Sequence, residues 1–171
     1  MKEIKLYNVI FPVWFLLFFP PVIFITLFGN LIIDSLVVIA AFTMFRMTAH
    51  QISLKSFYKR SIIKVWLFGF AADLIGAAIL FVTGITGDQL GLPHEVTSAV
   101  NFDPFSHPAG LAVVIIAMLI SGLYIFIFNY YLTFVRLIED KGLRFKTALT
   151  IAVITIPWTF LLPTRWFYNG F

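Results

Sequence analysis

The sequence predicts an all-α integral membrane protein, a compact bundle of five transmembrane helices with the N-terminus in the cytoplasm and the C-terminus outside. The 171 residues are 61% hydrophobic and 12% charged, and their mean hydropathy is +0.99. Soluble domains carry about 25% charged residues, so a water-soluble domain is excluded. Five stretches with almost no charge approach the roughly 20 residues that a helix needs to cross a bilayer.

The five predicted spans form a single transmembrane domain, residues 1–171. They cover about residues 8–28, 31–47, 65–83, 111–135 and 147–162. Gly29 and Asn30 both tolerate the positive φ of a tight turn, which predicts a turn between the first two spans. Pro20 and Pro21 each lack a backbone N–H, so the first helix is expected to kink there.

Orientation follows from Lys and Arg, which are held back on the cytoplasmic side during insertion. If the N-terminus is inside, every Lys and Arg except Arg165 falls in the cytoplasm. The long outer loop, residues 84–110, contains three carboxylates and no Lys or Arg. The sequence therefore predicts an integral protein of a prokaryotic-type plasma membrane, N-in and C-out.

Residues 48–64 mix basic and apolar side chains, which predicts a short helix lying on the inner headgroups. Each basic residue there gains about 1 kcal/mol from anionic lipid. Lys55, Lys59 and Arg60 are the candidate headgroup contacts, and simple anchoring is the alternative to specific recognition. The net charge of +4 follows the topology, so we expect lipid and no nucleic acid as a partner. The short second and fifth spans also point to a homo-oligomer or another membrane subunit.

The outer loop concentrates side chains that could hold a metal or act as an acid and base. Imidazole and carboxylate both suit zinc, but the spacing of these residues matches no metal motif. A solvated loop without a site is the competing interpretation. The chain has no Cys, which excludes thiolate centres, and we expect no cofactor. The candidates are His94, Glu95, Asp103 and His107.

Asp73 is the strongest candidate for a functional residue within the membrane. A charge in hydrocarbon costs about 2.5–3.5 kcal/mol on insertion scales, so an ionisable residue there is a functional candidate by default. Counting from the nearest basic residue places Asp73 about 13–14 Å along its helix, close to the midplane. The same count places Asp34 near the outer interface. Residues at a depth similar to that of Asp73 are Asn129, Thr155 and Tyr130, which predicts one polar layer inside the bundle.

Three functions compete on this evidence. The first is a small transporter, channel or membrane subunit that moves a proton, cation or small solute through the layer centred on Asp73. The second is a non-catalytic interaction or scaffold subunit of a larger membrane complex, in which Asp73 contacts a partner or is purely structural. The third is a membrane-embedded enzyme with an outer-face His/carboxylate site, although the sequence leans against an enzyme. A sensor of lipids or hydrophobic small molecules is the remaining alternative.

Overall fold

The computed structural model describes residues 12–16, 19–20 and 22–166, which contain helices and connecting turns but no strand. Three helices are long and apolar enough to cross a membrane: α2, α3, and α5 with its continuation to Thr133. These findings agree with the predicted all-α membrane class. The α-helices are α1 (Val13–Leu16), α2 (Val22–Met44), α3 (Leu54–Thr86), α4 (His94–Phe102), α5 (Pro108–Phe128) and α6 (Lys141–Thr155).

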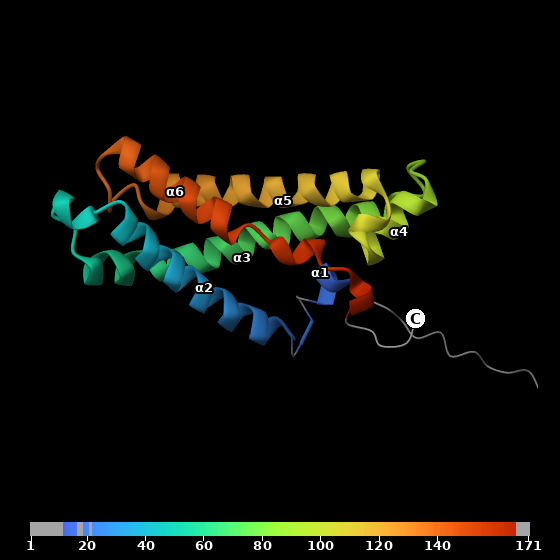
Figure 1. The fold of residues 1–171 in the computed structure, drawn as a ribbon, viewed down its shortest axis with the longest axis horizontal. Coiled ribbons are helices and arrows are strands. Elements are labelled where there is room, and N and C mark those ends of the chain that lie inside the picture. The colour runs from blue at the N-terminus through green and yellow to red at the C-terminus, as the bar shows by residue number, and fades with distance from the viewer. Residues whose placement is uncertain (1–11, 17–18, 21, 167–171) are drawn as a thin grey trace, which may run out of the picture.

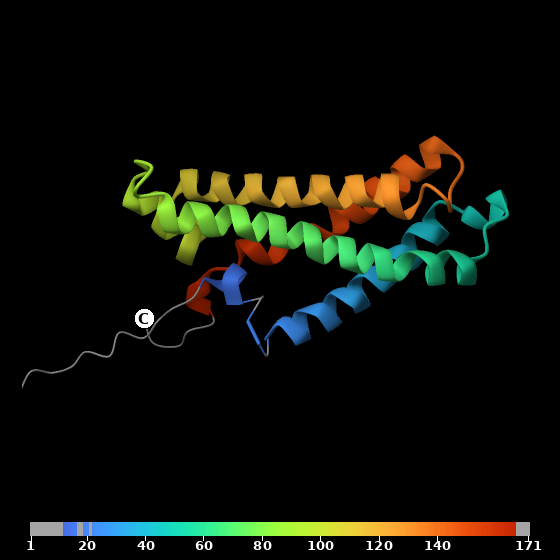
Figure 2. The same cartoon turned by 180° about the vertical axis from the view of Figure 1, so that it is seen from behind.

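The helices are arranged along one long axis (Figure 1). α3 and α5 lie side by side over most of its length, and α4 packs at the end where α3 ends and α5 begins. α6 packs against the C-terminal part of α5 and against α2. Figure 2 shows from behind that the N-terminal half of α2 diverges from the α3–α5 pair. This divergence leaves space between α2 and the end of α6.

The contact between α3 and α5 depends on small residues. Ala72 and Ser121 are fully buried, and the Ser121 hydroxyl donates a hydrogen bond of 3.0 Å to the Ala72 carbonyl oxygen. A Cβ added at Gly76 would lie 3.2 Å from the Ala117 carbonyl oxygen and would collide with the Ser121 hydroxyl. Small residues let membrane helices approach closely. Ala72 and Gly76, four residues apart on one face of α3, therefore form a packing element.

The predicted turn at Gly29–Asn30 is wrong. α2 runs from Val22 to Met44 without interruption, so most of the second predicted span and the end of the first belong to one helix. Gly and Asn cost only about 1 kcal/mol or less in a helix interior, and apolar neighbours on both sides outweigh this cost. The break occurs instead between α1 and α2, where Phe19 and Pro20 are not helical.

The number of helices agrees with the prediction, although their identities do not. Five α-helices, α2 to α6, have at least 9 residues among those that the structure describes. α4, from the predicted outer loop 84–110, is one of them. No long helix corresponds to the first predicted span, residues 8–28, of which residues 8–11, 17–18 and 21 lie outside the described residues.

The basic segment is not a separate surface helix. Residues 54–64 form the first turns of α3, which extends the third predicted span, residues 65–83, in both directions. Ser53 begins this helix, since its side chain accepts a hydrogen bond from the Ser56 amide at 3.3 Å. Only the 3₁₀ turn Met47–His50 and a short link separate α3 from α2. The backbone hydrogen bonds of α3 therefore continue through the basic segment, although its mixture of basic and apolar side chains predicts a separate surface helix.

The last two helices also differ from their predicted bounds, residues 111–135 and 147–162. His107 caps α5 and Pro108 occupies its first turn, and α5 continues into a π-helix over Asn129–Thr133. Asp140 caps α6, accepting a hydrogen bond of 2.5 Å from the Leu143 amide. α6 ends ahead of Pro157, which cannot continue a helix because it lacks an N–H. A 3₁₀ turn, Trp158–Leu161, follows.

The described N-terminal residues lie at the α4 end of the molecule. The Trp14 indole N–H donates to the Val100 carbonyl oxygen at 3.1 Å, and Phe15 stacks on Phe81 at a ring distance of 5.7 Å. The prediction of a cytoplasmic N-terminus depends on Lys2 and Lys5, which lie outside the described residues. Trp14 and Phe15, which follow them in the sequence, lie at the opposite end of the molecule from the basic first turns of α3.

We predict that Gly76→Ala lowers the free energy of unfolding by about 1–3 kcal/mol, because the added methyl must displace atoms of α5. Gly29→Ala is the matched control, since a Cβ at Gly29 meets no atom within 4 Å. The control is expected to leave stability unchanged or to raise it slightly through helix propensity. Thermal unfolding in mild detergent, followed by helical circular dichroism, measures both. Equal stability of the two variants would contradict the close packing of α3 on α5.

Candidate functional site

A cavity is formed where α2 diverges from α3, and we name it the carboxyl pocket. Its volume is about 200 Å³. Asp34 comes from α2, Asp73 from α3 and Thr155 from α6, so three helices bring polar side chains to one place. The 3₁₀ turn after α6 closes the remaining side. The full lining is Thr26, Asn30, Ile33, Asp34, Gly69, Phe70, Asp73, Ile154, Thr155, Ile156, Pro157, Trp158, Thr159 and Phe160.

Two helix faces meet at this pocket with complementary shapes. Asn30 and Asp34 are four residues apart on α2, and Gly69 and Asp73 are four apart on α3, so each pair lies on one face. A Cβ at Gly69 would lie 3.7 Å from Asp34 Oδ2. Gly69 therefore lies next to the Asp34 carboxyl group, at ordinary van der Waals distance from an added Cβ.

The position of Asp34 corrects the sequence analysis. Its side chain is only 5% exposed, and it lines the same pocket as Asp73 rather than lying in water at the outer interface. The depth of Asp34 is counted from Arg46 and that of Asp73 from Lys64, but α3 begins ten residues before Lys64, at Leu54, so the two counts do not start from the same level. The two carboxyl groups are close enough for their charges to interact.

Neither carboxyl group is satisfied by the described protein atoms. Asp73 Oδ1 is buried and has no hydrogen-bond partner among them. Asp34 forms no hydrogen bond or ion pair with another described residue. Its carboxyl group interacts electrostatically with that of Asp73. Buried carboxylates are normally paired or hydrogen-bonded. The pocket therefore holds two carboxyl groups without a protein counter-ion among the described residues.

The predicted polar layer is divided between two places. Asp73 and Thr155 line the carboxyl pocket, and the Thr155 hydroxyl donates to the Ile151 carbonyl oxygen at 2.8 Å. Asn129 is fully buried elsewhere, in the π-helical segment, where its Nδ2 donates to the Ile125 carbonyl oxygen at 2.9 Å. Tyr130 packs beneath the Arg144 guanidinium, 4.6 Å from the ring centre. Depth along a helix does not determine which face a side chain occupies.

The His and carboxylate residues of the outer loop have local roles. Asp103 Oδ1 accepts from the Phe105 amide at 3.2 Å, and His107 Nδ1 accepts from the Ala109 amide at 3.2 Å. Glu95 is exposed in the first turn of α4. Within the part of the chain that the structure describes, no three His, Asp or Glu side chains are grouped to hold a metal.

His94 instead joins Asp88 in a small polar cluster at the start of α4. Asp88 Oδ1 accepts a hydrogen bond of 2.5 Å from the Thr97 hydroxyl, and Oδ2 lies 3.3 Å from His94 Nδ1. These hydrogen bonds, that of Thr97 first and that of His94 second, lower the pKa of Asp88 from its ordinary value. The cluster ties the loop after α3 to α4.

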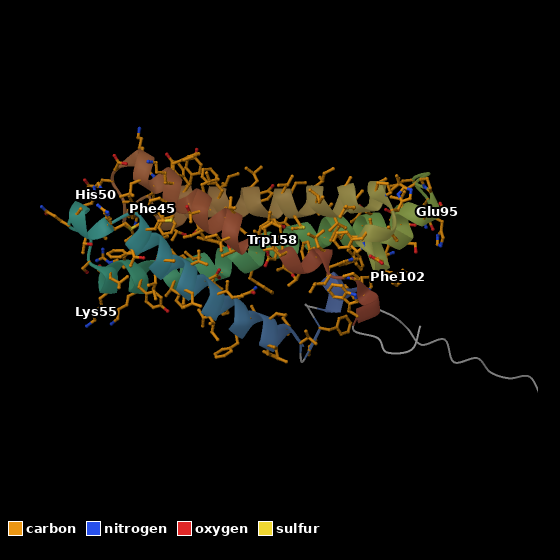
Figure 3. All side chains as sticks on the ribbon, in the orientation of Figure 1. Phe45, His50, Lys55, Glu95, Phe102 and Trp158 are labelled. Carbon is orange, nitrogen blue, oxygen red and sulfur yellow. The ribbon has the colours of Figure 1, made fainter. Side chains whose placement is uncertain are left out.

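The candidate headgroup residues lie at the opposite end of the molecule. Lys55, Lys59 and Arg60 are exposed on the first turns of α3. Figure 3 shows Lys55 and His50 at one end of the long axis, Glu95 and Phe102 at the other, and Trp158 near the middle. The carboxyl pocket, with Trp158 in its lining, therefore lies between the basic end and the outer-loop end.

We predict that Asp88→Asn lowers the melting temperature near pH 6, because it removes the negative charge that Thr97 and His94 stabilise. The lowered pKa of Asp88 means that this stabilisation is present above the ordinary value of 3.8 and is lost as the pH falls through the folded-state pKa. The difference from the wild type should therefore shrink below about pH 4. Thermal unfolding between pH 3 and pH 7 measures it, with the exposed Glu95→Gln as control. A difference that grows on acidification would contradict the sign.

A comparison of the chain with protein-family models, curated proteins and solved structures finds no match. Function is therefore inferred from the chemistry of the carboxyl pocket.

Proposed function

We propose that this protein is a membrane transporter or channel-like subunit that moves a proton, cation or small charged solute through the carboxyl pocket. The observation that supports this proposal is the meeting of Asp34 and Asp73, from two different helices, in one pocket without a protein counter-ion. The sequence predicts Asp73 at the centre of such a path, and the position of Asp34 in the same pocket supports a carboxyl pair there.

The chemistry of a carboxyl pair suits transport. Two carboxylates held close together in an apolar environment repel each other, and each also loses hydration. A proton or a cation bound between them relieves both costs, and its release restores them. Ionisable residues inside membranes commonly mark ion pathways and proton relays for this reason. Asp73 Oδ1, which is buried and unpartnered, is the atom with most to gain from such an occupant.

The distribution of charge supports a C-out orientation for this proposal. Basic residues gather at the end formed by the C-terminus of α2, the N-terminus of α3 and the link between α5 and α6, and include Arg46, Lys55, Lys59, Arg60, Lys141 and Lys146. The positive-inside rule places this end in the cytoplasm of a prokaryotic-type plasma membrane. The outer-loop end and Trp166 then lie outside. Five crossings with the N-terminus inside would require one crossing ahead of Trp14, which packs at the outer end.

A second function, a subunit of a larger membrane complex, is favoured by the same open carboxyl groups. A Lys or Arg from a partner helix could enter the pocket between α2 and α6 and neutralise the pair. Such a contact would be a buried salt bridge, which is stable only when both charges are well hydrogen-bonded. Native mass spectrometry of the protein extracted in mild detergent distinguishes the two functions, because a stoichiometric second polypeptide would favour the subunit.

We predict that Asp73→Asn and Asp34→Asn each reduce transport about tenfold or more, because an amide can neither exchange a proton nor attract a cation. The measurement is proton, Na⁺ and K⁺ flux in liposomes containing purified protein, under an imposed membrane potential. Glu95→Gln is the matched control, since it removes one carboxylate from the exposed surface of α4.

Normal folding of the three variants is checked by gel filtration and circular dichroism before the flux is compared. Flux in both pocket variants equal to that of the wild type would remove the carboxyl pocket from transport. Flux lost equally in Glu95→Gln would show that the effect does not belong to the pocket.

A further inference from the structure

The carboxyl pocket is larger than a bare metal ion requires. A dry protein cavity of about 150 Å³ holds a benzene molecule, and this one measures about 200 Å³. The space therefore suits an occupant with several non-hydrogen atoms, or an ion that keeps part of its water.

Much of the pocket wall offers no ligand to an inorganic ion. Ca²⁺ takes six to eight oxygen ligands and Mg²⁺ takes six in near-octahedral geometry, whereas Asp34 and Asp73 are the only carboxyl groups in this lining and the other polar side chains are neutral. Phe70, Trp158 and Phe160 add aromatic side chains to the lining, and Ile33, Ile154 and Ile156 add aliphatic ones. These apolar groups cannot coordinate a metal ion, but they bury apolar surface well.

The mouth of the pocket is apolar as well. Trp158 is 57% exposed, Ile33 is 50% exposed and Ile154 is 48% exposed, and all three also line the pocket. They belong to α2 and to the segment around the end of α6, where these two elements face each other. These exposed apolar side chains would meet hydrocarbon when the outer helix surfaces lie in lipid, as the proposed function requires.

Two carboxyl groups and three aromatic side chains in one lining form the recognition pattern of an organic ammonium ion. The ammonium group would lie between the carboxyl groups of Asp34 and Asp73, each of which lacks a protein counter-ion. Its alkyl or aryl part would lie against the aromatic rings, which also attract cations through their faces.

We propose that the carboxyl pocket binds small organic ammonium ions that carry an apolar group, and that these ions enter sideways from the lipid between α2 and the end of α6. This inference rests on the proposed transport function and names its substrate class. Asp34, which is 5% exposed, lines the pocket and forms no hydrogen bond with another described residue, is the independent observation that supports a cation in this site.

Equilibrium binding of radiolabelled benzyltrimethylammonium to the purified full-length protein in detergent tests this proposal. We expect saturable binding that millimolar NaCl or KCl does not displace. Asp34→Asn and Asp73→Asn should each weaken it about tenfold or more, since each removes one partner of a buried charge contact. Trp158→Leu, which keeps an apolar side chain but removes the ring, should weaken it about threefold.

Gly69→Leu provides a test that leaves both carboxyl groups in place. Its side chain would extend from α3 toward Asp34 and fill the pocket, because only the Asp34 carboxyl group lies within 4 Å of an added Cβ. We expect this variant to lose ammonium binding. Glu95→Gln, distant from the pocket, is expected to bind like the wild type.

The inference is overturned by an absence of saturable binding, by binding unaffected in Asp34→Asn, Asp73→Asn and Gly69→Leu, or by displacement at low millimolar Na⁺ or K⁺. The liposome assay separates this failure from failure of the transport proposal. Loss of proton or metal-ion flux in Asp73→Asn without ammonium binding would keep transport and reject the ammonium substrate. Ammonium binding with no difference in any flux, including that of the labelled ammonium ion, would keep the site and reject transport.

Discussion

The close approach of α3 to α5 is the contact on which the rest of the structure depends. Helices in lipid gain little from hydrophobic burial against each other, so packing of small residues and interhelical hydrogen bonds must hold them together. Ala72, Gly76 and Ser121 supply both at one level. No residue of α5 lines the carboxyl pocket, which lies on another side of α3. The α3–α5 pair is thus the fixed support against which α2 and α6 are placed.

α2 is attached to this support along part of its length only. Trp66 of α3 donates its indole N–H to the Leu27 carbonyl oxygen at 2.8 Å, and further along α2 Val37 and Val38 enter the core around Phe57 and Phe134. Between these attachments lies Asp34. The carboxyl groups are therefore located where helix packing is incomplete, which keeps them open to an occupant while the helices that carry them stay anchored.

Sequence reasoning predicts the parts of this structure that depend on composition, including the all-helical class and the membrane-length apolar helices. The importance of Asp73 stays a prediction. Sequence reasoning did not predict that Asp34 joins Asp73, because counting from basic residues assumes that each span begins at its nearest charge. α3 begins at Leu54, and this shifts its register against α2. The consecutive antiparallel helices α2 and α3 each contain one acidic residue, and this pattern could have predicted that Asp34 and Asp73 meet. The prediction that Asn129 belongs to the layer of Asp73 uses only its depth along the helix. Depth does not tell which face of the helix a side chain occupies.

The short length of α6 has a consequence for the surrounding bilayer. Its 15 residues rise about 22 Å, less than the roughly 30 Å of a hydrocarbon core, and Pro157 prevents its extension. α3, with 33 residues, rises about 50 Å. Lipids next to a short helix thin or rearrange to match it. The membrane beside α6, where the carboxyl pocket opens, would then be thinner than the membrane beside α3. A charge that reaches the pocket from the α6 side therefore crosses less hydrocarbon than it would beside α3.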